Sequence, residues 1–95
     1  MSARNHFRDR KQAFAQVKKG KDVERLCLRS DEVSKVSNCK GSHVKVTVRG
    51  GNSFVYPNHN ELRTGTRIAI IDAMIRFKII FIGITILALL CAIVV

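Results

Sequence analysis

The fold is decided by residues 43–56, whose sequence is HVKVTVRGGNSFVY. The first half of this stretch alternates between apolar and polar residues, which is typical of a strand with one buried face. Gly50 and Gly51 supply the positive φ angles that a tight turn needs. The returning stretch from Ser53 to Tyr56 completes a predicted β-hairpin.

The length of the hairpin loop decides which side chains share a face. A two-residue loop would put Val46 on the same face as Val55. A loop of three or five residues instead pairs Val48 with Phe54 and Val46 with Tyr56, which collects the large apolar groups on one face. Because a slip of one residue moves every side chain to the other face, the apolar pattern favours the odd loop.

The segments before the hairpin predict a helix and a weaker third strand. Asp22 is placed to cap a helix that runs to about Ser30, and Gly20 is a natural end for an earlier helix. The inward face of the capped helix repeats at i, i+3 and i+4. Its members are Val23, Leu26 and Cys27. Residues 33–39 are the strand candidate.

The segment after the hairpin predicts a second helix. Thr64 or Thr66 can cap a helix that runs from Arg67. Its apolar residues recur at i, i+3 and i+7, and we expect them to pack on the sheet: Ile68, Ile71 and Ile75. The predicted fold class is α+β, in the order helix, strand, strand, strand, helix: a small three-stranded antiparallel sheet with helices on one face.

The charge balance predicts an anionic partner. The chain has 17 Lys and Arg against 7 Asp and Glu, a formal net charge of +10, and all of these residues lie in the range 1–78. Such a balance fits nucleic acid, an acidic protein or an anionic membrane surface, and it does not choose among them.

Cysteine usage indicates a reduced compartment. Cys27, Cys39 and Cys91 are odd in number and show no C-x-x-C spacing, which argues against a disulfide framework and a standard zinc site. Cys39 lies four residues before His43, with no further pair to complete a metal site. Residues 1–25 are too charged to contain the apolar core of a secretory signal. We therefore expect the basic part to lie in the cytoplasm and to hold no metal.

An uncharged apolar run extends from Ile79 to Val95. As a helix it would span about 25 Å, slightly short of a roughly 30 Å hydrocarbon core, and Arg76 and Lys78 can snorkel to the headgroups. The run predicts a tail anchor that holds the basic domain at the cytoplasmic membrane. The alternative is an apolar helix that is buried against a partner protein.

These patterns predict three parts of the chain. Residues 1–19 form a basic N-terminal extension, residues 20–77 the α+β domain, and residues 78–95 a C-terminal hydrophobic helix. In the extension, three apolar residues can line one side of a helix that we expect to be solvated or dependent on a partner: Phe7, Phe14 and Val17.

The polar face of the first hairpin strand carries the side chains that could take part in catalysis or phosphate binding. His43 lies in a row with the cations Lys45 and Arg49, so a group that moves protons near neutral pH stands beside groups that attract phosphate. An ordinary half-buried strand whose polar side includes a histidine has the same pattern. The surrounding motifs favour the functional interpretation.

Two blocks of residues resemble a known family. The first is Lys40-Gly41-Ser42-His43 at the start of a strand. The second runs through Pro57-x-His59, Glu61-Leu62 and Gly65-Thr66-Arg67 at the start of a helix. In order and spacing, residues 20–77 resemble the HicA (YcfA-like) toxins, which are small mRNA interferases of bacterial toxin–antitoxin modules.

The resemblance implies a fold similar to double-stranded-RNA-binding domains, with one catalytic histidine that maps onto His43. It implies an endoribonuclease that cleaves mRNA without a metal or another cofactor. It also implies inhibition by a HicB-type antitoxin protein. The basic extension of residues 1–19 and the apolar tail depart from the family, whose members are ordinarily soluble.

The residues suit this chemistry, because RNA carries its own nucleophile in the 2′-hydroxyl. An imidazole can accept the hydroxyl proton and thereby form a 2′,3′-cyclic phosphate, and such base catalysis typically contributes about 10²–10⁴-fold. Two residues next to His43 can also serve an RNA chain, since Gly41 permits close approach of its backbone and Ser42 can hydrogen-bond a phosphate oxygen. The cations expected to hold phosphates are Lys40, Lys45 and Arg49.

Two other functions fit the same sequence. One is a non-catalytic, membrane-anchored RNA-binding or adaptor protein that retains the fold, and the other is a small membrane protein whose basic domain binds anionic lipid. His59 is either a second proton-transfer group or a loop residue that fixes the exit from the strand after Pro57.

Overall fold

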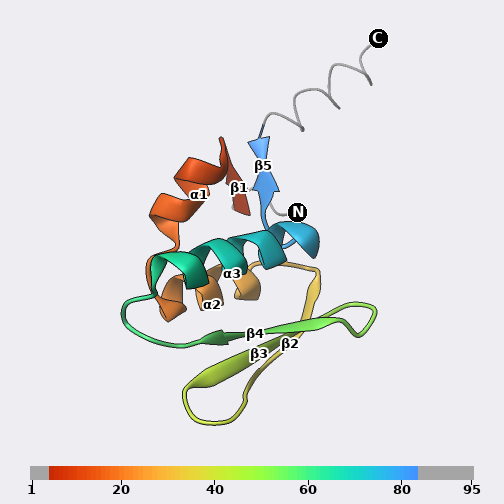
Figure 1. Ribbon diagram of the computed structural model, residues 1–95. Coiled ribbons are helices and arrows are strands. Elements are labelled where there is room, and N and C mark those ends of the chain that lie inside the picture. Colours follow the sequence, from red (N-terminus) through yellow and green to blue (C-terminus); the bar gives the residue numbers. More distant parts are fainter. Residues whose placement is uncertain (1–4, 84–95) are drawn as a thin grey trace.

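The computed structural model describes residues 5–83, which form an α+β domain (Figure 1). In chain order the elements are β1 (His6–Phe7), α1 (Arg10–Gln16), α2 (Gly20–Leu28), β2 (Val33–Asn38), β3 (His43–Val48), β4 (Ser53–Pro57), α3 (Thr64–Arg76) and β5 (Phe81–Ile82). Strands β2, β3 and β4 form an antiparallel sheet in that order. The three helices lie on the same side of it in Figure 1. The predicted three-stranded sheet with helices is therefore confirmed.

The hairpin loop between β3 and β4 is odd, as predicted. The backbone N–H of Val48 donates to the carbonyl of Asn52 at 2.8 Å, which leaves residues 49–51 as a three-residue loop. Gly50 and Gly51 both have a φ of 94°, a left-handed conformation that costs glycine little. The turn chemistry read from the sequence is thus confirmed.

The register of the hairpin differs by two residues from the prediction. Val46 pairs with Phe54 and Val44 with Tyr56, whereas the prediction paired Val48 with Phe54. A shift of two residues keeps every side chain on its face, because the side-chain period of a strand is two. The expected apolar face therefore forms with different partners.

The core lies between this face and the helices. The buried strand residues are Val44, Val46, Val48 and Tyr56. The predicted inward face of the first helix is confirmed, since Val23, Leu26 and Cys27 are all buried on α2. Burial raises the pKa of the Cys27 thiol to about 12, with a smaller contribution from the charge of Glu24, so Cys27 stays protonated as a packing residue.

Helix α2 begins earlier than predicted, and Gly20 begins this helix instead of ending an earlier one. Asp22 lies inside the first turn, where one carboxylate oxygen accepts from the backbone N–H groups of Lys18 and Lys19, both at 3.0 Å. The carboxylate thus stabilises the start of the helix from the third helical position instead of the cap position.

Helix α3 buries a different stripe from the predicted one. Ile71 is buried and Ile75 is half-buried, but Ile68 is 45% exposed. The fully inward residues are instead Ile70 and Met74 beside Ile71. Apolar residues lie on several sides of this helix, so their spacing alone does not select the buried face.

The described part of the N-terminal extension packs on the domain, so the expectation of a solvated or partner-dependent helix is wrong there. Ala13 and Val17 are fully buried. The side chain of Arg67 on α3 donates from Nε to the carbonyl of Val17 at 2.7 Å, and its guanidinium lies 3.7 Å from the ring centre of Phe14. Cation–π stacking and burial together hold α1 against α3.

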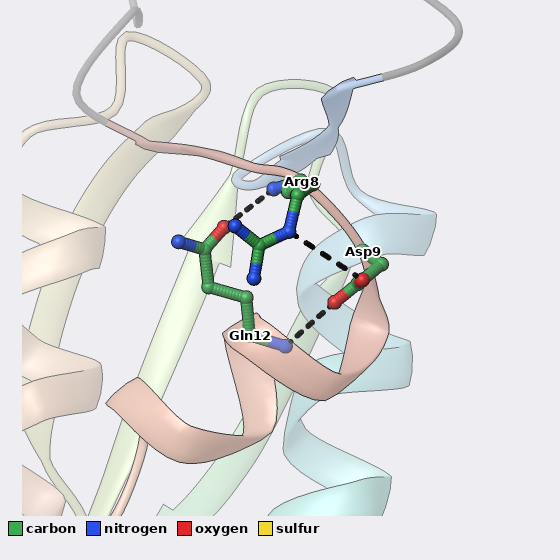
Figure 2. Close-up of polar contacts among 3 residues, drawn as sticks. All are labelled: Arg8, Asp9 and Gln12. Carbon is green, nitrogen blue, oxygen red and sulfur yellow. Dashed lines mark hydrogen bonds and ion pairs between the residues drawn. The ribbon is translucent and has the colours of Figure 1, made fainter.

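Hydrogen bonds among Arg8, Asp9 and Gln12 lie at the start of α1 (Figure 2). The Asp9 carboxylate accepts from the backbone N–H of Gln12 at 2.8 Å, as an N-cap does. The Gln12 side chain accepts in return from the backbone N–H of Arg8 at 2.6 Å. These contacts stabilise the start of a seven-residue helix, and the buried residues Ala13 and Val17 then hold this segment on the domain.

The first residues of the predicted C-terminal helix have another role. Lys78 has a φ of 61°, and α3 ends before it. Ile79 and Ile80 are buried in the core, and β5 then pairs in parallel with β1. The prediction of a helix from residue 78 is therefore wrong for residues 78–82, because these apolar side chains complete the domain core. Within residues 5–83, no helix is long and apolar enough to cross a membrane; the rest of the predicted helix lies outside the described residues.

Candidate functional site

The polar side chains of β3 project away from the core, because the valines that alternate with them are the buried residues. In Figure 1 the helices lie on one side of the sheet, and we call the other side the open face. His43 and Lys45 are exposed and Thr47 is half-buried, while the alternating valines are buried. His43 is the first residue of β3 and pairs with Pro57, the last residue of β4. The histidine therefore lies at one end of the hairpin, in reach of an external ligand.

The turn before β3 brings three of the predicted binding residues to this end. Lys40, Gly41 and Ser42 are all exposed. The backbone N–H of His43 donates to the carbonyl of Lys40 at 3.3 Å, and that of Cys39 donates to the carbonyl of His43 at 2.9 Å. Gly41 has a φ of 64° at the tip of this turn, so the turn itself requires glycine there.

Arg49 does not join this group. It lies in the loop after β3, where its backbone N–H donates to the carbonyl of Glu32 at 2.9 Å. It is six residue steps of extended chain from His43, a distance of about 20 Å. Arg49 can therefore contact only a distant part of a long ligand.

Strand β2 adds a cation that the sequence reading did not include. Lys35 is exposed and pairs with Thr47, and Ser37 pairs with Lys45. Directly paired residues of antiparallel strands project from the same face. Lys35 and Lys45 thus lie on the open face together. A register shift between Val33 and Lys35 interrupts the alternation of residues 33–38, so the sequence pattern did not show which face Lys35 occupies.

His59, whose role the sequence left open, lies beside the predicted site. Its Nε2 is 3.0 Å from the hydroxyl oxygen of Ser42, a hydrogen-bond distance. The strand pairing continues past β4, since the backbone N–H of Asn58 donates to the carbonyl of Ser42 at 2.8 Å. The two histidines therefore flank Ser42 at the same end of the hairpin. The P-x-H spacing was the only sequence signal for this.

Helix α2 supports the segment that carries His59. The backbone N–H of Gly20 donates to the carbonyl of His59 at 2.8 Å. A Cβ atom at position 20 would lie 2.2 Å from Asn58 Oδ1 and 2.7 Å from its Cα. Only glycine permits this close approach, so the start of α2 and the exit from β4 are packed directly together.

The site offers imidazole, hydroxyl and ammonium groups for chemistry. Within residues 5–83, no three His, Cys, Asp or Glu side chains gather as a metal site would require. Exposed imidazoles can accept or donate protons, and lysines can hold phosphate oxygens. The arrangement suits acid–base chemistry on an anionic ligand.

Comparisons with known proteins add no relative: no protein-family model, curated protein or solved structure matches this chain. The resemblance to the HicA toxins thus rests on the two motif blocks.

Proposed function

We propose that this chain is a HicA-like toxin that cleaves RNA, with His43 as the catalytic base. The observation that carries the proposal is the position of His43. It is exposed at the end of a sheet face that no helix within residues 5–83 covers and that also presents Lys45 and Lys35. A histidine that served only to fill a core would not lie there.

The cleavage uses the 2′-hydroxyl of RNA as the nucleophile. His43 accepts the hydroxyl proton while the 2′-oxygen forms a bond to phosphorus. The bond between phosphorus and the 5′-oxygen breaks, which leaves a 2′,3′-cyclic phosphate on one fragment and a 5′-hydroxyl on the other. No metal or cofactor takes part in this scheme, since the nucleophile belongs to the substrate.

The neighbouring groups bind the RNA chain. Lys45 shares a face of β3 with His43 and Lys40 lies in the turn before it, and both are exposed, so both can hold phosphates next to the cleaved bond. The Ser42 hydroxyl can donate to a phosphate oxygen. Arg49, which lies about 20 Å from His43, contacts phosphates in a distant part of the RNA. These contacts place the 2′-hydroxyl at His43.

The partner and location follow from the same proposal. A HicB-type antitoxin would inhibit the enzyme, and an acidic surface on it would match the cations of the open face. Attachment to the cytoplasmic membrane remains a proposal for the apolar residues after Ile82, because Ile79 and Ile80 belong to the core.

The test is cleavage of a labelled RNA oligonucleotide by the purified full chain. We expect a 2′,3′-cyclic phosphate product and no cleavage where the nucleotide at the cut lacks its 2′-hydroxyl. His43→Gln should lower the rate by about 10²–10⁴-fold. His6→Gln, the same change at a histidine on β1, is the matched control and should retain activity.

Two results would contradict the proposal. One is cleavage by His43→Gln at the wild-type rate. The other is RNA binding by the wild type without cleavage, which favours the non-catalytic RNA-binding or adaptor protein. Binding to acidic vesicles that does not depend on His43, with no affinity for RNA, favours the lipid-binding alternative.

A further inference from the structure

The contact between Ser42 and His59 has no part in the scheme above. The two side chains come from the turn before β3 and the loop after β4, and their polar atoms lie 3.0 Å apart. Both residues are exposed, so the pair is not needed to satisfy a buried polar group. An exposed imidazole held beside a candidate phosphate ligand is available for proton transfer.

The leaving group of the reaction also needs a proton, which a second protein group can supply faster than water does. When the 2′-oxygen attacks, the leaving 5′-oxygen departs on the opposite side of phosphorus and gains negative charge. A base on one side of the phosphate therefore cannot readily protonate the leaving group on the other. Two groups from different positions around the same phosphate are the efficient arrangement.

We propose that His59 is the general acid of this site. This inference rests on the proposed RNA cleavage. His43 accepts the proton of the 2′-hydroxyl, and the bond between the 2′-oxygen and phosphorus forms. His59 donates the proton from Nε2 to the 5′-oxygen as the bond between phosphorus and that oxygen breaks. Solvent then exchanges the two protons, which restores both imidazoles.

The backbone around His59 is arranged to hold such a group in place. The carbonyl of His59 accepts from Gly20 N–H, and its own N–H donates to the carbonyl of Pro57 at 3.0 Å. Pro57 in turn pairs with His43. A short chain of backbone contacts therefore connects His59 to His43 through Pro57, and Ser42, the chain neighbour of His43, contacts the His59 ring.

The test measures the rates at which the purified full chain cleaves two RNA oligonucleotides. One is natural, and the other carries sulfur in place of the 5′-oxygen at the cleaved bond. A thiol ionises near pH 8.5, far more readily than an alcohol, so the sulfur leaves without a general acid. We expect His59→Gln to slow cleavage of natural RNA by about 10²–10⁴-fold, and to slow the sulfur-containing RNA by less than about tenfold.

Three variants make the result specific. His43→Gln should be slow on both substrates, because the base is needed for either leaving group. Ser42→Ala removes the hydrogen bond to His59 and the proposed phosphate donor; it should show a smaller loss on natural RNA than His59→Gln, and the sulfur substrate should recover only the part of the loss that is due to His59. Asn60→Ala, a change at an exposed neighbour, should cleave both RNAs at the wild-type rate.

The outcomes separate the two proposals. If His43→Gln abolishes cleavage but His59→Gln does not, His59 is not the acid and the proposed function stands. If His59→Gln slows both substrates equally, His59 serves binding or folding only, and the inference is overturned. If the wild type cleaves neither RNA, the proposed function fails and the inference fails with it.

Discussion

The two faces of the sheet are built by the same strands but carry different side chains. On the face toward the helices, Val44, Val46 and Tyr56 are buried in the core. On the other face, His43 and Lys45 are exposed. Because successive residues of a strand point to opposite faces, one hexapeptide supplies stability on one side and chemistry on the other. Substitutions on the two faces should therefore affect different measurements.

The largest expected effect is loss of stability from the covered side. Met74 on α3 is fully buried, and Met74→Ala should lower the free energy of unfolding by about 2–5 kcal/mol because it leaves a cavity. Val55→Ala, on the open face where Val55 is 48% exposed, should change it by about 0.5 kcal/mol or less. Urea denaturation measures both. Equal losses would show that the open face is covered in solution.

A smaller effect is expected at the start of α2. Burial of the Asp22 carboxylate raises its pKa, but the hydrogen bonds from Lys18 and Lys19 and the charge of Arg25 outweigh this, so the pKa is lowered overall. Asp22→Asn should cost about 1 kcal/mol at neutral pH, since the amide replaces a charged acceptor.

The pH dependence of this difference follows from the direction of the shift. A carboxyl whose pKa is lower in the folded state contributes its stabilisation above the unfolded value of about 3.9 and loses it as the pH falls through the folded value. The wild type and Asp22→Asn should therefore converge in stability as the pH falls below about 3.9. A difference that stays constant from pH 7 to pH 2.5 would contradict this assignment.

The smallest effect is expected from a single cation on the open face. Lys45→Gln should weaken RNA binding and reduce the slope of log affinity against log salt by about 0.7–1, because one phosphate contact is lost. The free energy of unfolding should stay within about 0.5 kcal/mol of the wild type. Lys11→Gln, at an exposed lysine on α1, is the matched control and should leave the salt slope unchanged. Identical slopes for both variants would place the RNA elsewhere.

Local patterns predicted the hairpin well and α3 less well. The alternation around Val46 and the glycine pair at residues 50–51 indicate one strand and one turn, and both are confirmed. On α3, exposed Ile68 and buried Ile70 are equally apolar, so the spacing alone does not reveal which of them faces the sheet. That choice depends on where the strands and α1 lie around the helix.

The candidate site shows the same division. The motif residues Lys40 to His43 are adjacent in the chain, so their gathering at one turn follows from the sequence. The contact between Ser42 and His59 joins residues 17 positions apart, and Gly20 supports it from another element. No single stretch of sequence contains that information, because it depends on how three elements pack.

By itself, the sequence determined which side chains of β3 lie together, the odd loop at Gly50 and Gly51, and the basic character of the domain. These features follow from the two-residue period of a strand, from local backbone sterics and from composition. Only the tertiary structure decided that Ile79 and Ile80 fill the core, that the N-terminal segment packs on α3, and that His59 meets Ser42. These outcomes depend on contacts between distant parts of the chain, where apolar area is buried wherever the packing leaves room for it.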